Sequence, residues 1–383
     1  MKRRDRAPLR APTVASARQA GARIQSKVLR TPLVRLNWAP AGAAGAGDDD
    51  VQIWLKLEQL QRIGSFKVRP ASNAMAALAA RLDGGMDAVR ARGVCTASAG
   101  NFGQGLAWAA SEENVPCCIV APDTVPATKL AACEAYPGTA VVQVPYADWW
   151  TVIETHQAPQ APAGALFVHP GAESACLEGN ATIALEIVED LPDVDAILVP
   201  YGSGSICTGI ACVAKELRPG GACAVLACEP ATAAPFALSK QRGAPSRFDA
   251  WAPSFVDGCG GKAVLEEVWA VAKDAVDGGL AVPLDSIARA IRVLCERNRV
   301  VAEGAGACPV AAAMDELERR ARADGGGGGA ASPSPLAGKR RIACVVSGGG
   351  LDTSKLIKIL QGGCPGDGKA SKTAGAAPPA PDD

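Results

Sequence analysis

The chain has 383 residues, and its 39 lysine and arginine side chains balance 39 aspartate and glutamate side chains, so the formal net charge is zero. A balanced charge gives no support to nucleic-acid binding, which favours a basic surface. The sequence also contains no run of about 18 uncharged apolar residues that could span a bilayer. Only 4% of the residues are aromatic and 42 are glycine, which points away from a β-sandwich.

Short apolar segments alternate along the chain with alanine-rich segments of helical pattern. Because these apolar segments are continuous rather than alternating with polar residues, they fit strands of a parallel sheet that is buried on both faces. Strand–helix alternation over this length predicts an α/β fold with parallel crossovers. We predict strands at 53–57, 93–96, 116–120, 140–144, 165–168, 196–200, 224–228 and 342–346. We predict helices at 70–81, 103–113, 127–135, 176–190, 206–217 and 284–298.

Other segments are rich in glycine, proline, alanine and aspartate and predict little regular structure. We expect a surface insertion at 40–50, a flexible loop at 323–338, and disordered tails at 1–11 and 363–383. The Arg-rich first ten residues leave an organelle-targeting fragment open, but a cytoplasmic protein is our expectation.

The 14 cysteines are scattered, without a C-x-x-C pair, and only His156 and His169 could join them as imidazole ligands. A zinc site needs clustered ligands at short spacing, so we expect no metal. No signal peptide precedes the cysteines, which argues against secretion with disulfides. We expect reduced thiols that act as small buried hydrophobes.

Ligands of parallel α/β sheets bind beyond the carboxyl ends of the strands, so the turns at those ends are the candidates for chemistry. The first, residues 64–69, places Lys67 just before a predicted helix, with Pro70 where a missing N–H is tolerated. Lys67 is either a solvated charge or a desolvated amine of lowered pKa, which Schiff-base chemistry requires.

The second turn, residues 96–103, carries Ser98 and Asn101 where helix-capping residues stand. Simple capping and a pocket for a carboxylate are both open. The fourth turn, residues 346–350, places Ser347 at a strand end, where its hydroxyl could meet a ligand ring or belong to a plain glycine turn.

The third turn, residues 199–206, joins a predicted strand to a predicted helix. Gly202 and Gly204 allow close approach of a ligand, and the N–H groups at the helix start favour an anion such as phosphate. No Gly-Lys-Ser/Thr follows, so this is not a Walker loop. Cys207 stands where the third glycine of a dinucleotide fingerprint belongs, which disfavours a nicotinamide-dependent dehydrogenase. A tight turn without a ligand remains the alternative.

The order of the four turns resembles the pyridoxal-phosphate enzymes of fold type II, the serine/threonine dehydratase and serine racemase group, which are similar to the tryptophan synthase β chain. The matching segments are Ser-Phe-Lys, Ser-Ala-Gly-Asn, Val-Pro-x-Gly-x-Gly and Ser-Gly-Gly, in that order. The resemblance runs from about 12 to 362 and includes 30–33, 56–58, 182–186, 229–230 and 303–307. It implies a large cofactor-binding lobe of 12–90 and 169–362, and a small lobe of 91–168 that closes over the substrate.

The resemblance also implies roles for single residues. Lys67 would bind pyridoxal 5'-phosphate as a Schiff base and later remove the substrate α-proton, with Phe66 against it. Asn101 would hydrogen-bond the ring hydroxyl of the cofactor, and Ser347 would face the ring nitrogen. The cofactor phosphate would lie against Gly202, Ser203, Gly204, Ser205 and Ile206. The substrate carboxylate would lie against Ser98, Ala99, Gly100 and Asn101.

A serine beside the ring nitrogen stabilises the protonated ring less than a carboxylate does, which favours prompt β-elimination over transamination. The expected reaction converts L-threonine or L-serine to a 2-oxo acid and ammonia. In the serine racemases of this family, a serine at the place of Ala99 serves as an acid/base. Alanine has no proton to exchange, so we expect little racemase activity.

Several positions depart from the family pattern: Pro70, Phe102, Ser203, Ser205 and Gly350. They leave the substrate open, with serine racemase, 3-hydroxyaspartate ammonia-lyase, β-replacement as in cysteine synthesis, and a non-catalytic cofactor-binding protein as alternatives.

The family's cation site would use Glu229 and an aspartate, but Pro235 stands in the second position, so we expect this site to be weakened or lost. The expected partners are a small amino-acid substrate and a second copy of the chain in a homodimer, with no nucleic acid and no membrane.

Overall fold

The computed structural model describes residues 8–40, 51–98, 100–125, 127–324 and 334–366. Within them the strands form two sheets, and every pairing is parallel except that of β1 with β2. The six-stranded sheet has the order β1 (Leu33–Arg35), β2 (Gln52–Lys56), β10 (Arg341–Val345), β7 (Ala196–Pro200), β8 (Ala224–Pro230), β9 (Gly278–Val282). The four-stranded sheet has the order β5 (Thr139–Val144), β4 (Cys117–Pro122), β3 (Val94–Ala97), β6 (Leu166–Phe167). The predicted α/β fold is confirmed.

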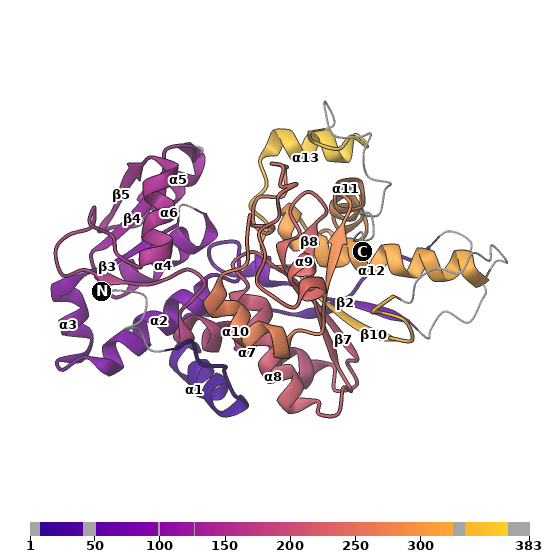
Figure 1. Cartoon of the computed structure of the whole chain (residues 1–383), viewed down its shortest axis with the longest axis horizontal. Helices are drawn as coiled ribbons and strands as arrows, with labels where there is room; N and C mark the ends of the chain where they lie inside the picture. The colour runs from indigo at the N-terminus through magenta and orange to yellow at the C-terminus, as the bar shows by residue number, and fades with distance from the viewer. Residues whose placement is uncertain (1–7, 41–50, 99, 126, 325–333, 367–383) are drawn as a thin grey trace, which may run out of the picture.

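Helices cover both sheets (Figure 1). They are α1 (Val14–Ile24), α2 (Val68–Arg81), α3 (Gly85–Arg92), α4 (Asn101–Glu112), α5 (Ala127–Glu134), α6 (Tyr146–Thr155), α7 (Ser174–Asp190), α8 (Ser205–Leu217), α9 (Pro235–Arg242), α10 (Glu266–Ala275), α11 (Leu284–Val293), α12 (Gly304–Asp324) and α13 (Thr353–Leu360). The helix predicted over 284–298 ends earlier, because the chain continues from α11 as a π-helical turn at Leu294–Asn298. In Figure 1 the four-stranded sheet lies on the left with α4, α5 and α6, and the six-stranded sheet lies on the right.

The central strands of the six-stranded sheet, β10, β7 and β8, are buried on both faces, as their continuous apolar sequence predicted. Along β7, Ile197 and Val199 pack in one apolar cluster with residues of α7, α8 and α10. The intervening Leu198 packs in a second cluster with residues of α11 and α12. This alternation of neighbouring side chains between two cores is what a strand with both faces covered requires.

The boundaries predicted for the two lobes stay a prediction. Parts of the predicted insertion, loop and tails, residues 1–7, 41–50, 325–333 and 367–383, lie outside the described residues. At the described ends of these segments, Leu336 and Cys364 are buried in the core, and the backbone N–H of Arg10 donates to Ser174. No helix in the described ranges has the length and apolar character needed to cross a membrane.

Glu229, the residue implied for a cation site, is buried at the end of β8. Its carboxylate accepts hydrogen bonds from the backbone N–H groups of Phe236 and Ala237, in the first turn of α9. Burial raises the pKa of Glu229 to about 8, and these two N–H groups act in the opposite direction. The carboxylate therefore caps a helix whose first residue is Pro235.

Candidate active site

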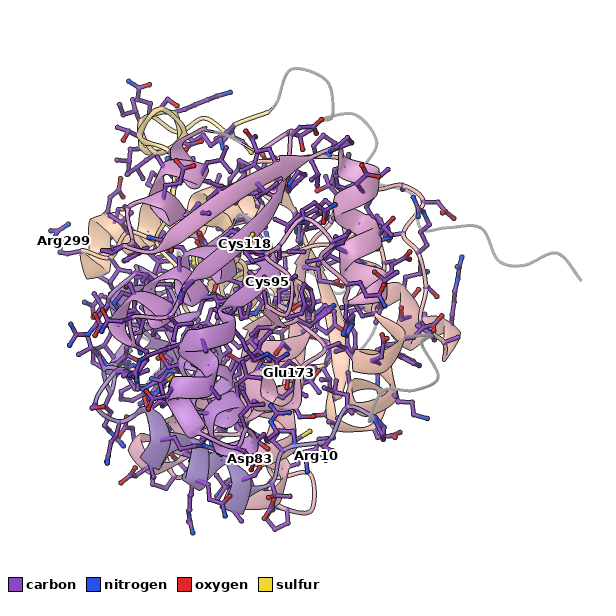
Figure 2. The ribbon with its side chains drawn as sticks, turned by 90° about the vertical axis from the view of Figure 1, so that its left-hand side faces the viewer. Arg10, Asp83, Cys95, Cys118, Glu173 and Arg299 are labelled. Atoms are coloured by element: carbon purple, nitrogen blue, oxygen red, sulfur yellow. The ribbon has the colours of Figure 1, made fainter. Side chains whose placement is uncertain are left out.

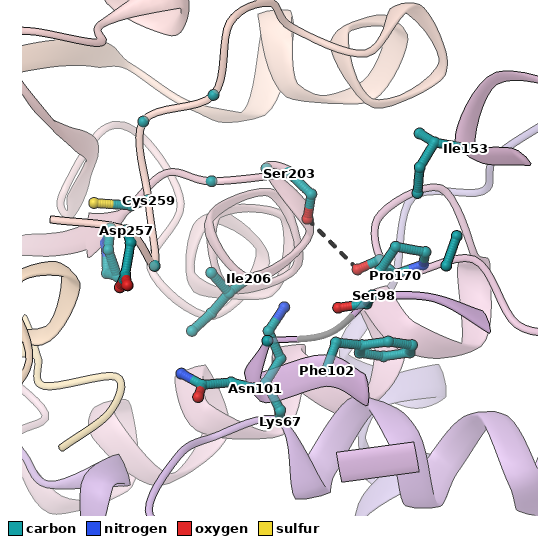
Figure 3. Close-up of a pocket in the computed structure, with 18 of the residues that line it drawn as sticks. Lys67, Ser98, Asn101, Phe102, Ile153, Pro170, Ser203, Ile206, Asp257 and Cys259 are labelled. Atoms are coloured by element: carbon teal, nitrogen blue, oxygen red, sulfur yellow. Dashed lines mark hydrogen bonds between the residues drawn. The ribbon is translucent and has the colours of Figure 1, made fainter. Parts of the chain in front are cut away.

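A cavity of about 530 Å³ is lined by the turns that follow β3, β7 and β10 and by the turn before α2. It brings together at least one side chain from each of the four turns singled out in the sequence, Lys67, Asn101, Ser203 and Ser347 among them. Figure 3 shows the first three of these side chains. All three strands end at the cavity with their carboxyl ends, as expected for a parallel α/β sheet.

Lys67 precedes α2, and its half-buried side chain lines this cavity. Nζ lies 4.7 Å from the ring centroid of Phe66 and 5.5 Å from that of Phe102. Burial lowers the pKa of Lys67 to about 8, although Cys176 and Glu303 act to raise it. These surroundings favour the desolvated amine over the solvated charge, and the role of Lys67 stays a prediction.

The Lys67 turn is fixed by backbone contacts to the loop after β10. The N–H of Phe66 donates to the carbonyl of Ser347 at 2.9 Å, and the N–H of Gly349 donates to the carbonyl of Gly64 at 2.9 Å. On the other side, α4 packs so closely that a Cβ at Gly105 would lie 2.9 Å from the Lys67 carbonyl oxygen. These contacts hold the lysine backbone between two lining turns.

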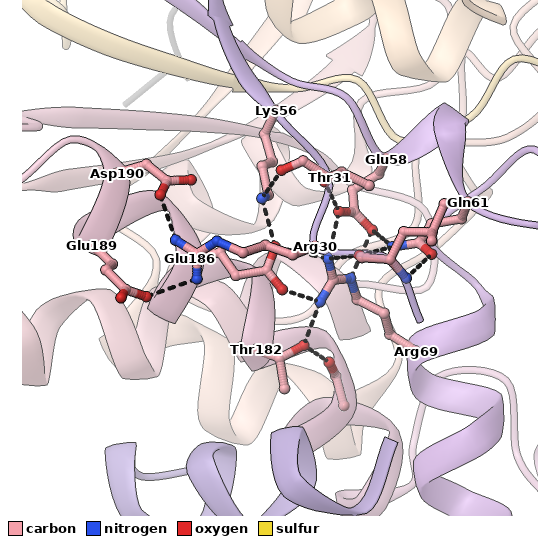
Figure 4. A network of polar contacts seen from close by, with 12 residues as sticks. Arg30, Thr31, Lys56, Glu58, Gln61, Arg69, Thr182, Glu186, Glu189 and Asp190 are labelled. Carbon is pink, nitrogen blue, oxygen red and sulfur yellow. Dashed lines mark hydrogen bonds and ion pairs between the residues drawn. The ribbon is translucent and has the colours of Figure 1, made fainter. Parts of the chain in front are cut away.

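A buried ion network anchors the first turn of α2 just beyond Lys67 (Figure 4). The Arg69 guanidinium binds Glu58 through two nitrogens, both at 2.8 Å, and binds Glu186 at 2.7 Å. Lys56 Nζ lies 2.5 Å from the other oxygen of Glu186. Burial acts to raise the pKa of Glu58, but Arg69, Thr31 and Lys56 together outweigh burial and hold that pKa below its ordinary value. The network therefore ties α2 to β2 and α7 through ionised groups that are buried only because they are paired.

The turn after β7 leads into α8, whose N-terminus has no side-chain cap. Gly204 occupies the N-cap with φ +87°, and a Cβ there would lie 2.5 Å from the Tyr201 hydroxyl oxygen. A Cβ at Gly202 would lie 3.1 Å from the carbonyl of Gly258. The start of α8 therefore presents N–H groups to an anion, and a side chain at Gly204 would be both strained and in conflict with Tyr201.

The two serines of this turn differ in direction. Ser203 lines the cavity, and its Oγ lies 3.5 Å from the carbonyl of Pro170 (Figure 3). Ser205 is buried, and its hydroxyl accepts a hydrogen bond from Asn180 Nδ2 at 2.9 Å instead of lining the cavity.

The N-terminus of α4 also opens on the cavity. Gly100 is its N-cap and no side chain caps it, so neither Ser98 nor Asn101 is the simple cap that the sequence left open. Ser98, Gly100 and Asn101 all line the cavity. Ala99 lies outside the described residues. A second uncapped helix N-terminus beside Lys67 suits a second anion.

Glu303 is a functional candidate that sequence reasoning missed. It is buried, lines the cavity and accepts a hydrogen bond from Asn101 Nδ2 at 3.0 Å. Added Cβ atoms at Gly258 and Gly348 would lie 2.9 and 2.6 Å from its carboxylate, so both positions leave room for it. Burial raises its pKa to about 7, against an opposing effect of Asn101. The sequence signal that could have identified Glu303 is a single acidic residue at the start of a segment of small residues, 303–307.

The structure therefore places most of the predicted site residues around one cavity. Those that line it are Phe66, Lys67, Ser98, Gly100, Asn101, Gly202, Ser203, Gly204, Ile206 and Ser347. Ser205 does not line the cavity. The individual role of each residue stays a prediction.

Comparisons with known proteins agree with this geometry. The family model described as "Pyridoxal-phosphate dependent enzyme" matches residues 24–330. The chain is 33% identical to an L-threonine ammonia-lyase of Thermotoga maritima, over 82% of this chain and 70% of that protein. Maize serine racemase has a similar structure, with a TM-score of 0.76, 29% identity, and coverage of 92% of this chain and 98% of that one. The processed form of threonine deaminase isoform 2 from Solanum lycopersicum gives a TM-score of 0.72 and 26% identity, with coverage of 94% and 93%.

Proposed function

The chain belongs to the pyridoxal-phosphate dependent enzymes, and we propose that it is an ammonia-lyase that converts L-threonine, L-serine or both to a 2-oxo acid and ammonia. The observation that carries the proposal is the amine of Lys67, with its pKa lowered to about 8, in one cavity with two uncapped helix N-termini. One helix start suits the cofactor phosphate and the other suits the substrate carboxylate.

The residues present fit pyridoxal phosphate. A desolvated lysine amine is the group that binds its aldehyde. The glycine-lined start of α8 suits its phosphate because the helix dipole and free N–H groups favour an anion. Lys67 would hold the aldehyde carbon, residues 202–206 the phosphate, Asn101 the ring hydroxyl, and Ser347 the ring nitrogen.

When bound, pyridoxal phosphate supplies an electron sink for the charge left by removal of the α-proton. Lys67 then acts as the base, because an amine with a pKa near the working pH accepts a proton readily and can return it. The α4 N-terminus and Ser98 bind the substrate carboxylate and so orient the α-carbon towards Lys67. The protonated lysine delivers its proton to the departing hydroxyl group.

Glu303 and Ser347 influence this chemistry through Asn101 and through the cofactor ring. Both Glu303 oxygens accept from Asn101 Nδ2, at 3.0 and 3.3 Å, and so fix the orientation of the Asn101 amide at the cavity. A hydroxyl at Ser347 does not stabilise a protonated ring as a carboxylate does, and this favours elimination over transamination. Replacing Ser347 with aspartate should therefore slow elimination relative to side reactions.

Racemisation needs a second proton donor on the face opposite Lys67. Ala99 carries no exchangeable proton, so we propose that D-serine forms from L-serine far more slowly than pyruvate does, despite the similarity to serine racemases. D-serine formation at a rate close to that of pyruvate would contradict this.

The test incubates the purified holoenzyme with L-threonine, L-serine, O-acetylserine plus sulfide, and 3-hydroxyaspartate, and follows ammonia, 2-oxo acid and thiol product. We expect ammonia and oxo acid from threonine or serine, and none from Lys67→Ala. Borohydride reduction should label the peptide that contains Lys67. Thiol product without ammonia would instead identify a β-replacement enzyme, and labelling without any turnover a non-catalytic cofactor-binding protein.

We also propose a small lobe of 91–168 that closes over the substrate and excludes water, a homodimer, and a cytoplasmic location. An organelle is the alternative location. The large lobe would then comprise 12–90 and 169–362.

A further inference from the structure

Aromatic side chains are concentrated at the cavity in a chain that has few of them. Only 4% of the residues are aromatic, yet Phe66, Phe102, Trp149 and Trp150 all line the cavity. Aromatic surfaces recognise apolar and aromatic ligand groups through burial and ring contacts. Phe66 and Phe102 flank the lysine, which leaves the two tryptophans without a part in the proposed chemistry.

The two tryptophans belong to an apolar wall on α6. Trp149, Trp150 and Ile153 all line the cavity from this one helix. The Trp149 ring lies 5.5 Å from the ring of Tyr146 and 6.1 Å from that of Trp150, centroid to centroid. Figure 3 shows the Ile153 side chain directed towards Pro170, on the far side of the cavity from Asn101.

The α6 wall is the part of the cavity left for the substrate side chain, an argument that rests on the proposed function. The α-carbon must lie at Lys67, the carboxylate at the start of α4 and the cofactor phosphate at the start of α8. The β-substituent then has to point away from these three sites, towards α6.

Charged groups near this wall are already engaged with protein partners. The basic side chains in the described lining are Lys67, Lys129, Lys262 and His169, whose Nδ1 accepts from the backbone N–H groups of Gly171 and Ala172. Lys129 pairs with Asp257 at 2.6 Å. Lys262 Nζ lies over the rings of Tyr146 and Trp251, at 5.0 and 4.7 Å from their centroids. An acidic side chain such as that of 3-hydroxyaspartate would have to displace one of these contacts.

We propose that the α6 wall selects 2-amino-3-hydroxy acids whose β-carbon carries a large apolar or aryl group, and that Trp149 and Trp150 determine this specificity. For 3-phenylserine, the α C–H and the β C–O bonds break and water leaves. The resulting enamine transfers a proton from nitrogen to its β-carbon and becomes an imine. Water then adds to the imine, the C–N bond breaks, and phenylpyruvate and ammonia are released. The atoms balance without an oxidant or a second substrate.

The kinetic test compares kcat/KM for threo-3-phenylserine, threonine, serine and threo-3-hydroxyaspartate on the holoenzyme. We expect phenylserine to exceed threonine by about tenfold or more, the lower range for an extra apolar group in a fitted pocket. Trp150→Ala should raise KM for phenylserine about tenfold and change kcat/KM for threonine less than about threefold. Trp54→Phe, in β2 and outside the cavity lining, is the matched control and should change neither value. A preference for serine or hydroxyaspartate would overturn the proposal.

A binding measurement separates this inference from the proposed function. L-phenylalanine, L-alanine and L-aspartate lack a β-hydroxyl group, so calorimetry can compare their binding without elimination. We expect L-phenylalanine to bind about tenfold more tightly than the other two, and Trp150→Ala to remove the difference. If this preference holds but no hydroxy acid releases ammonia, the lyase proposal fails and the inference stands. If threonine is turned over but L-phenylalanine binds no better than L-alanine, the inference fails alone.

Discussion

The lowered pKa of Lys67 predicts how fast the cofactor-free protein captures pyridoxal phosphate at each pH. Only the neutral amine attacks an aldehyde. With a pKa of about 8, about one Lys67 amine in eleven is neutral at pH 7, against about one in three thousand for an ordinary lysine of pKa about 10.5. Burial should therefore accelerate capture at pH 7 by about 300-fold. The rate should rise about tenfold between pH 6 and 7 and level off above pH 8.

Stopped-flow absorbance of Schiff-base formation on the apoprotein measures this rate, and Lys67→Ala supplies the background. The Phe102 ring lies 5.5 Å from the amine and is itself buried, so Phe102→Ala should admit water and move the midpoint upward, towards pH 10.5. Glu303→Gln should move the midpoint downward, because the carboxylate raises the pKa of Lys67. A wild-type midpoint near pH 10.5, unmoved by Phe102→Ala, would refute the argument that desolvation sets the pKa.

Three further outcomes follow from the site. Gly204→Ala should weaken cofactor binding by about tenfold or more in a spectroscopic titration, because its Cβ would lie 2.5 Å from the Tyr201 hydroxyl oxygen at φ +87°; unchanged binding would contradict this. Arg69→Met should lower the free energy of unfolding by about 3–5 kcal/mol in urea, because Glu58 and Glu186 lose their shared cation; Arg81→Met, an exposed control, should cost far less. The pKa of Glu303 is raised to about 7, so kcat/KM should fall as the pH drops below about 7. Glu303→Gln should remove this decrease from the pH profile. A decrease that persists in the variant belongs to another group.

The elements that the sequence predicted well are those whose signal is local. Each of the eight predicted strands overlaps an observed one, because each contains a short run of mostly apolar residues, which in the central strands reflects burial of both faces. β9 escaped prediction because it begins with Gly278 and Gly279, which weaken a strand pattern. α12 escaped because Pro309 lies inside it, where proline normally ends a helix.

The site residues likewise differ in whether a local sequence signal could identify them. The turn containing Lys67 was identifiable because Ser-Phe-Lys directly before a predicted helix is the first of four short segments that occur in the family's order. The direction of Ser205 was not identifiable, since it depends on Asn180, 25 residues away in α7. Glu303 was missed because its burial comes from Gly258 and Gly348, which the sequence places far from it.

Desolvation of the Lys67 amine destabilises the folded apoprotein, and the contacts around the lysine have to offset this loss of stability. A pKa lowered from 10.5 to about 8 means that the folded apoprotein below pH 8 is destabilised by about 3 kcal/mol relative to one with an ordinary lysine. That cost declines as the pH rises from 8 towards 10.5, because in this range the unfolded chain still binds a proton that the folded state has already lost. The lysine cannot relieve it by turning towards water, because Phe66 is tied to Ser347 on one side and Arg69 is held by two glutamates on the other. The buried network next to Lys67 therefore keeps the amine desolvated and reactive.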